Sequence, residues 1–195
     1  LLKLAGDSDS VVNEVDPPTQ VALTESGTEF VAKDLSFKSP MIGWHQALNN
    51  SVAIEAARLF MPGLKKETVD SGLQKVKWPG RLQRLCPETP LYYDVAHNVH
   101  GLYAILETIR RIFKQKPIGL FVMKGDKEID MVGAALKNQF EQLFISGAPE
   151  WGLLSGSQLS KKLSDEGLKG FEVMEPFEKA LDRVTKIAKT TNRPT

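Results

Sequence analysis

The fold of this chain is constrained most by an alternation of strand-type and helix-type segments along its second half. Short apolar runs suited to buried strands occur at residues 91–94, 118–123, 142–146 and 171–174, and helix-type runs follow them at residues 99–113, 129–137, 157–163 and 176–189. Strands separated by helices of this length build βαβ units, in which a parallel sheet is covered on both faces. We therefore predict an α/β domain over residues 78–195, with a Rossmann-like, doubly wound and mostly parallel sheet.

The first part of the chain carries a different pattern. Its β-prone runs, joined by turn residues, are residues 21–24, 29–32 and 35–37. Apolar residues at helical spacing predict an amphipathic helix over residues 45–60, which ends before Pro62. We therefore separate residues 1–62 from the α/β domain and expect residues 63–77 to be a linker of short helical or irregular structure.

Charge and composition exclude several classes of protein. The 25 Lys and Arg residues nearly balance the 24 Asp and Glu residues, and a net charge of +1 favours neither nucleic acid nor an anionic membrane as a partner. Cys86 is the single cysteine, so an intrachain disulfide is excluded and a reducing cytoplasm is favoured. No apolar run approaches the roughly 18 residues that a membrane span needs. We expect a cytoplasmic protein with no nucleic-acid or membrane partner.

Two motifs lie at the ends of what we interpret as a β-hairpin or strand entry. They are Trp78-Pro79-Gly80-Arg81-Leu82-Gln83 and Asp94-Val95-Ala96-His97-Asn98. Arg81 follows a Pro-Gly turn that would aim its side chain, and a planar guanidinium with five donors suits a terminal phosphate. The alternative is an ordinary surface arginine on a loop.

Asp94 and His97 of the second motif come directly after a predicted strand. In doubly wound sheets ligands bind beyond the carboxyl ends of strands, where one carboxylate can accept hydrogen bonds from both ribose hydroxyls. Asp94 is equally suited to cap the helix that begins near Asn98, and the two roles can coexist. His97 lies where an imidazole meets a substrate carboxylate or phosphate near a helix N-terminus, or has no role.

Two further polar residues are candidates for ligand binding. Asn49 shares a predicted helix face with His45, and an asparagine amide can pair with the edge of adenine; otherwise it is an exposed polar residue. Lys127 follows the strand-type run at residues 118–123 and suits an anionic substrate, unless it lies in a solvated turn. The sequence contains no Gly-x-x-x-x-Gly-Lys-Ser/Thr phosphate loop, no catalytic triad pattern and no metal-ligand spacing. We therefore predict no metal site within this chain.

Taken in order, these motifs resemble the folylpolyglutamate synthase/dihydrofolate synthase family, within the larger group of Mur-type ATP-dependent amide ligases. The resemblance covers roughly residues 19–185. It is carried by Gly43-Trp44-His45-Gln46-Ala47-Leu48-Asn49, by the two motifs around Arg81 and Asp94, and by Met123 to Glu128 with Asp126-Lys127.

The resemblance implies a division of labour along the chain. Residues 1–62 would hold the last strands and helix of a central ATPase domain, and residues 78–195 would be the Mur ligase C-terminal domain, which closes over the nucleotide. One more strand is implied after the last helix. By resemblance, Asn49 contacts adenine, Arg81 the terminal phosphates, Asp94 the ribose, and His97 and Lys127 the substrate, with Arg81 and His97 as the catalytic pair.

The implied activity is that of an ATP-dependent acid–amino-acid ligase. ATP would activate the carboxylate of dihydropteroate or a folate as an acyl phosphate, and L-glutamate would then displace the phosphate. Mg²⁺ would bridge the phosphates, with ligands mainly outside this chain, and the enzyme would be a monomer. Without a phosphate loop the fragment alone is expected to be inactive. The alternatives are part of a Mur-type cell-wall peptide ligase, or a non-catalytic nucleotide-binding module that lacks the phosphate-loop half.

Overall fold

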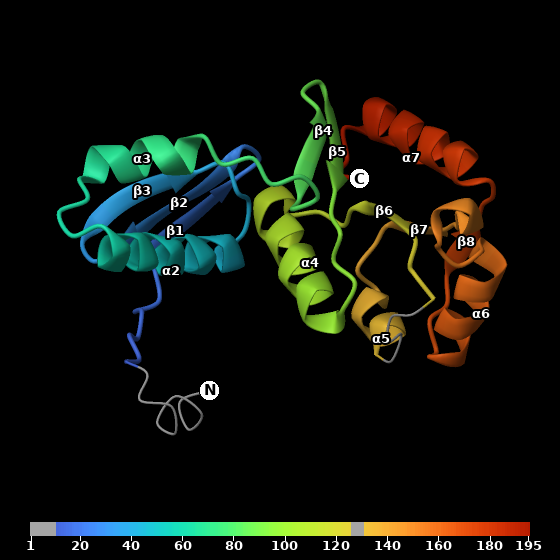
Figure 1. Ribbon diagram of the computed structural model, residues 1–195. Helices are drawn as coiled ribbons and strands as arrows, with labels where there is room; N and C mark the ends of the chain where they lie inside the picture. Colours follow the sequence, from blue (N-terminus) through green and yellow to red (C-terminus); the bar gives the residue numbers. More distant parts are fainter. Residues whose placement is uncertain (1–10, 126–130) are drawn as a thin grey trace. The chain divides into compact units, whose positions relative to one another are not determined.

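The computed structural model describes residues 11–125 and 131–195, and the chain divides after Lys77 into two compact units (Figure 1). Each unit has its own hydrophobic core. No helix in these described ranges is long and apolar enough to cross a bilayer. The first unit contains β1 (Thr19–Thr24), β2 (Gly27–Ala32), β3 (Leu35–Ser39), α2 (Trp44–Phe60) and α3 (Lys66–Gln74).

In the first unit, two helices pack on an antiparallel sheet of order β1-β2-β3. Phe30 and Phe37 are direct partners on β2 and β3, with ring centroids 5.8 Å apart, and both side chains are buried. Around them lie Ala47 and Ile54 of α2 and Val69 and Leu73 of α3. The three predicted strands and the helix are confirmed, while the expected linker at residues 63–77 contains α3, which completes this core.

The second unit contains the alternating elements that the sequence pattern predicts. They are β4 (Gln83–Cys86), β5 (Thr89–Tyr93), α4 (Val99–Phe113), β6 (Ile118–Phe121), α5 (Val132–Leu136), β7 (Gln142–Ile145), α6 (Gly156–Asp165), β8 (Phe171–Val173) and α7 (Phe177–Thr191), with a 3₁₀ turn at Pro149–Trp151. Strands β6, β7 and β8 pair in parallel in that order. The predicted α/β class with a parallel sheet is confirmed.

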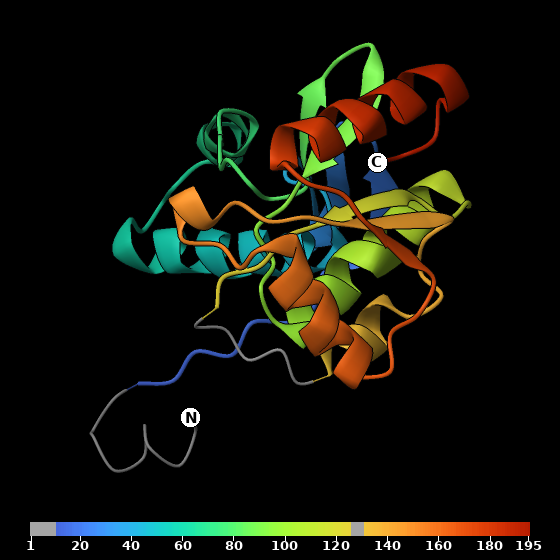
Figure 2. The ribbon, with the colours of Figure 1, turned by 90° about the vertical axis from the view of Figure 1, so that its right-hand side faces the viewer.

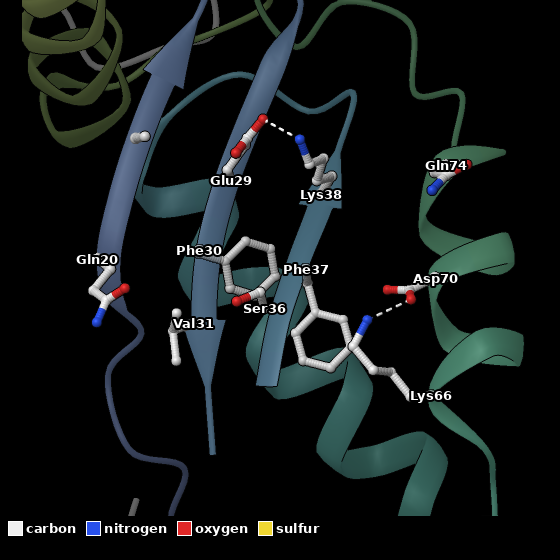
Figure 3. A pocket seen from close by; sticks show the side chains of 11 residues that line it. Gln20, Glu29, Phe30, Val31, Ser36, Phe37, Lys38, Lys66, Asp70 and Gln74 are labelled. Atoms are coloured by element: carbon white, nitrogen blue, oxygen red, sulfur yellow. Dashed lines mark hydrogen bonds and ion pairs between the residues drawn. The ribbon is translucent and has the colours of Figure 1, made fainter. Parts of the chain in front are cut away.

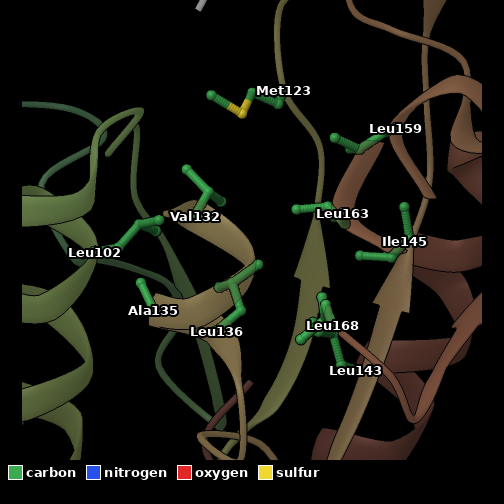
Figure 4. Close-up of a cluster of buried hydrophobic side chains, with 10 residues drawn as sticks. All are labelled: Leu102, Met123, Val132, Ala135, Leu136, Leu143, Ile145, Leu159, Leu163 and Leu168. Carbon is green, nitrogen blue, oxygen red and sulfur yellow. The ribbon is translucent and has the colours of Figure 1, made fainter. Parts of the chain in front are cut away.

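Both faces of the parallel sheet are covered by helices. Leu143 and Ile145 of β7 pack into a cluster with side chains from α4, α5 and α6 (Figure 4). Phe144 points to the opposite face, where it packs with Val184 of α7. Figure 2 shows α7 on one side of the sheet and α4, α5 and α6 on the other. This alternation of buried side chains on β7 is what a sheet covered on both faces requires.

One detail of the predicted sheet is wrong. The run at residues 91–94 was expected to be the first parallel strand, but β5 pairs antiparallel with β4. The apolar composition of β5 fits a parallel or an antiparallel partner. The two-residue turn between β4 and β5 favours β4, because little chain entropy is lost in closing so short a loop.

The last residues of the chain lie between β5 and β6. Thr195 donates its N–H to the carbonyl of Pro90 (2.9 Å) and accepts from the N–H of Tyr92 (2.7 Å), which is the pattern of a parallel pair. On its other side, the carbonyl of Pro194 accepts from the N–H of Ile118 at 2.9 Å. Residues 194–195 therefore stand where the resemblance implies a further strand, and they link the hairpin to the parallel sheet.

Deleting Pro194 and Thr195 should release the hairpin from the sheet, because the deletion removes these three backbone hydrogen bonds. We expect faster amide exchange at Tyr92 and Ile118 and a loss of roughly 1–4 kcal/mol in the free energy of unfolding. Hydrogen–deuterium exchange followed by NMR and urea unfolding measure both effects. Thr190→Ala, which removes an exposed hydroxyl and methyl group on α7 and leaves residues 194–195 in place, is the control. Unchanged exchange at Tyr92 in the deletion variant would contradict this assignment.

Candidate functional site

The two sequence motifs meet at one end of the β4–β5 hairpin. The turn that carries Arg81 precedes β4, and the segment from Asp94 to Asn98 follows β5. Gln83 is the direct partner of Tyr93 across the antiparallel pair. The chain therefore enters and leaves the hairpin at the same end, and the motifs lie side by side as the hairpin interpretation predicts.

Four hydrogen bonds, two between the motifs and one within each motif, hold this end of the hairpin, and we call them the Arg81 clasp. Asp94 accepts from two backbone groups: its Oδ2 from the N–H of Leu82 and its Oδ1 from the N–H of Ala96, both at 2.7 Å. The N–H of Val95 donates to the carbonyl of Gly80 at 3.0 Å. The N–H of Gly80 donates to Oε1 of Gln83 at 3.1 Å. Gln83 had no role in the sequence analysis; its position three residues after Gly80 was the available signal.

Gly80 cannot be replaced within the clasp without strain. Its φ of 74° lies in the left-handed region, and a Cβ atom added there would stand 2.7 Å from Cγ1 of Val95. Leu82 also has a positive φ, 45°, which is uncommon for a residue with a branched side chain, and its side chain is buried. The turn around Arg81 is thus held in a conformation that an unconstrained chain would rarely adopt.

Arg81 and His97, the two catalytic candidates, both have exposed side chains. Within the described ranges, the Arg81 guanidinium has no hydrogen bond or ion pair, so all its donors remain available for a ligand. Nδ1 of His97 lies 3.1 Å from the carbonyl of Val95. If Nδ1 carries the proton and donates to this carbonyl, Nε2 is left for another partner.

The cap of helix α4 decides one alternative for Asp94. The side chain of Asn98 accepts a hydrogen bond from the N–H of Gly101 at 2.8 Å, so Asn98 is the N-cap. The alternative in which Asp94 caps this helix is therefore wrong. Asp94 instead binds the backbone on both sides of the hairpin opening.

Asn49 lies on α2 in the first unit, where it belongs to a chain of polar side chains. Its Nδ2 donates to Oε1 of Gln46 at 3.2 Å, and Nε2 of Gln46 lies 3.0 Å from Nε2 of His45. Gln46 thus bridges the predicted pair of His45 and Asn49. Gly43, just before the helix, has a φ of 133°, and a Cβ there would meet the His45 ring at 2.5 Å.

Two other positions need separate mention. Lys127 lies outside the described residues. Asn50, beside Asn49, is 8% exposed, and its Nδ2 is buried without a hydrogen-bond partner among the described residues. A buried amide without a partner costs free energy of folding. Asn50 is therefore a second polar residue of α2, beside Asn49, that the sequence analysis missed.

A separate cavity of about 410 Å³ lies in the first unit, bordered by the sheet and α3 (Figure 3). Its charged side chains form two ion pairs, Lys66 with Asp70 at 2.5 Å and Lys38 with Glu29 at 2.7 Å. None of the site residues predicted from sequence lines it. Because its charges neutralise one another, it does not compete with the Arg81 clasp as an anion site.

Comparison with known proteins identifies what the second unit is similar to. Residues 80–192 match the profile of the Mur ligase, glutamate ligase domain. A dihydrofolate synthase/folylpolyglutamate synthase of Mycobacterium tuberculosis is 30% identical over 118 residues, which cover 56% of this chain and 24% of that protein. An Aquifex aeolicus UDP-N-acetylmuramoyl-L-alanyl-D-glutamate–2,6-diaminopimelate ligase is 29% identical over 100 residues, 51% of this chain and 20% of that protein.

Solved structures match almost the whole chain. Mycobacterium tuberculosis folylpolyglutamate synthase, complexed with ADP and AMPPCP, superposes with a TM-score of 0.82 at 25% identity, over 98% of this chain and 46% of that chain. A bifunctional folylpolyglutamate synthase/dihydrofolate synthase with Mn, AMPPNP and L-glutamate bound has a TM-score of 0.72 at 19% identity, over 96% and 44%. The chain thus spans about a quarter of the curated relative's length and under half of the solved chains.

Gly80→Ala should destabilise the second unit more than the matched change Gly152→Ala. Both glycines have a φ of 74°, but a Cβ at Gly152 meets nothing within 4 Å. We expect Gly152→Ala to cost about 1 kcal/mol in backbone strain and Gly80→Ala roughly 2–4 kcal/mol, since it also displaces Val95. Urea unfolding measures the difference, and NMR shifts of Ala96 and His97 report the displacement. Equal costs for the two variants would argue against a tight clasp.

Proposed function

Since this chain belongs to the Mur ligase family through the glutamate ligase domain at residues 80–192, we propose that it is part of an ATP-dependent acid–amino-acid ligase. The amino acid is L-glutamate and the acceptor is dihydropteroate or a folate. The similarity to a dihydrofolate synthase/folylpolyglutamate synthase in sequence, and to a folylpolyglutamate synthase in fold, supports this choice. The observation that carries the proposal is the exposed Arg81 guanidinium, held in a fixed turn by the clasp.

The reaction proposed has two steps. A carboxylate oxygen of the pterin-linked substrate takes the terminal phosphoryl group of ATP, which forms an acyl phosphate and releases ADP. The amino group of L-glutamate then attacks the acyl carbon, forming the amide bond as the C–O bond to phosphate breaks and a proton leaves the nitrogen. Negative charge builds on the phosphoryl oxygens in the first step. A preorganised guanidinium placed against these oxygens stabilises that charge.

Asp94 and His97 have roles in this proposal that fit their geometry. The two carboxylate oxygens of Asp94 accept the backbone N–H groups of Leu82 and Ala96, and because an ionised carboxylate has about four acceptor sites, we assign this side chain also to the hydroxyls of the ATP ribose. His97 stands just before the N-terminus of α4, whose dipole favours an anion. We assign it to a carboxylate of the incoming glutamate.

The remaining assignments extend the proposal beyond the hairpin. Asn49 contacts adenine through the amide that Gln46 orients, and Lys127 contacts anionic substrate. The enzyme acts as a monomer in the cytoplasm, the compartment that the single cysteine favours.

The residues that the structure describes do not form a preassembled site for a divalent metal ion. No group of three or more His, Cys, Asp or Glu side chains within residues 11–125 and 131–195 is placed to hold one. We therefore propose that Mg²⁺, which accompanies ATP, takes its ligands from outside this chain, and we assign no step to residues of this chain acting through it.

Two alternatives differ in substrate or in class. The first alternative, a cell-wall peptide ligase of the Mur type, has support from the similarity to the Aquifex aeolicus diaminopimelate ligase. A non-catalytic nucleotide-binding module would keep the clasp and bind nucleotide without turnover. Competition between folyl and UDP-linked substrates for the complete encoded protein distinguishes the cell-wall ligase from the folate ligase. ATP binding without ADP formation identifies the non-catalytic module.

In the complete encoded protein, Arg81→Ala should lower ADP formation that depends on both folate and glutamate by about 100-fold or more, because one charged contact to the phosphoryl oxygens is lost. Arg110→Ala is the matched control, since this exposed arginine on α4 pairs with Glu107, away from the hairpin. A coupled assay of ADP release measures both. Undiminished turnover in Arg81→Ala would refute the assigned role.

A further inference from the structure

We propose that Asp94 and Gln83 are positioning residues, which act on phosphate through Arg81 by fixing the turn that carries it. This inference rests on the proposed phosphate-binding role of Arg81. It goes beyond a ribose contact for Asp94, and it gives Gln83 a role of its own.

The residues on either side of Arg81 are held by hydrogen bonds. On one side, both backbone groups of Gly80 are bonded: its N–H donates to Gln83 Oε1 and its carbonyl accepts from the N–H of Val95. On the other side, the N–H of Leu82 donates to Oδ2 of Asp94. The peptide groups that flank Arg81 are therefore held from both directions, while its guanidinium stays in solvent.

Backbone conformation explains why the turn needs these bonds. Gly80 and Leu82 both have positive φ, a conformation that is strained for a leucine. Hydrogen bonds to an ionised carboxylate are shorter and stronger than neutral ones, and the two bonds to Asp94 measure 2.7 Å. The buried Leu82 side chain, 3% exposed, adds an apolar anchor. Without the Asp94 carboxylate, the turn has a lower-energy alternative in which Leu82 returns to negative φ and Arg81 moves.

The same carboxylate also holds the other motif. Oδ1 of Asp94 accepts from Ala96, directly before His97. One side chain therefore sets the spacing between the turn of Arg81 and the segment of His97. Removal of Asp94 should disturb both catalytic candidates even when no nucleotide is present. If the only role of Asp94 were to bind ribose, its removal would not have this effect.

The first arm of the test needs no activity. The ¹⁵N NMR spectrum of this chain is compared for Asp94→Asn, Gln83→Ala and the control Glu88→Gln, which removes a carboxylate at the far end of the hairpin. Asp94→Asn keeps the side-chain shape but replaces one acceptor oxygen with a donor. We expect large shifts and faster exchange at Leu82 and Ala96 and greater mobility of the Arg81 side chain, with no change in Glu88→Gln. Unchanged Leu82 and Arg81 signals in Asp94→Asn would overturn the proposal.

The second arm is a double-mutant cycle on ATP turnover by the complete encoded protein. A positioning residue acts through its target, so Asp94→Asn should lower kcat about 10-fold to 100-fold in the wild-type background but less than about 3-fold when Arg81 is already alanine. Gln83→Ala should cause a smaller loss in kcat that depends in the same way on the presence of Arg81. Equal losses in the two backgrounds would overturn the proposal.

Deoxynucleotides separate positioning from ribose binding. If Asp94 acts only on the ribose hydroxyls, its substitution should cost nothing further with 2′,3′-dideoxy-ATP, which lacks both of them, and that result would contradict us. We expect the loss in kcat to persist with this nucleotide. If the wild-type protein shows no turnover at all, the proposed function fails, while the NMR arm still decides whether Asp94 and Gln83 hold Arg81.

Discussion

The antiparallel pairing of β4 with β5 is the constraint on which the site depends. It places the two ends of a local hairpin together, so that Asp94 can reach the backbone of Leu82 across the opening. Burial of Leu82 and the charged hydrogen bonds then offset the strained backbone on either side of Arg81. A ligand that binds an arginine loses free energy by restricting both the side chain and the backbone that carries it. Anchoring the backbone in advance removes the second of these entropy costs before a ligand arrives.

The periodicity of the second half was sufficient to predict its α/β fold, because strands buried on both faces read as continuous apolar runs. Leu143 and Phe144 show this, since adjacent residues of β7 pack on opposite faces. Composition carries no information on which strand pairs with which, and for that reason β5 was counted among the parallel strands although its neighbour β4 pairs with it antiparallel. Likewise α3 is amphipathic and short, and only its contacts with β3 distinguish it from a linker.

The arrangement of the two motifs was predicted in part, and their residues explain why. Arg81 and Asp94 could be singled out as candidates by order and spacing, and the comparisons support the family to which those motifs belong. The hydrogen bonds that join the two motifs could not be predicted, because Asp94 binds backbone N–H groups, which every residue but proline offers. Gln83 was missed for the same reason, and Asn50 because burial of one face of α2 is a property of the folded unit. The ligand contacts of all the candidate residues remain predictions: Arg81, Asp94, His97, Asn49 and Lys127.

Residues 194–195 give the domain an order of assembly. They follow every strand of the parallel sheet in the chain, yet they supply the bonds that join β5 to β6. During synthesis the hairpin can therefore close early, since its two strands are neighbours in sequence, but its backbone link to β6 forms only after residues 194–195 have been made. Until then the turn that carries Arg81 lies on a hairpin that has no backbone hydrogen bonds to the parallel sheet.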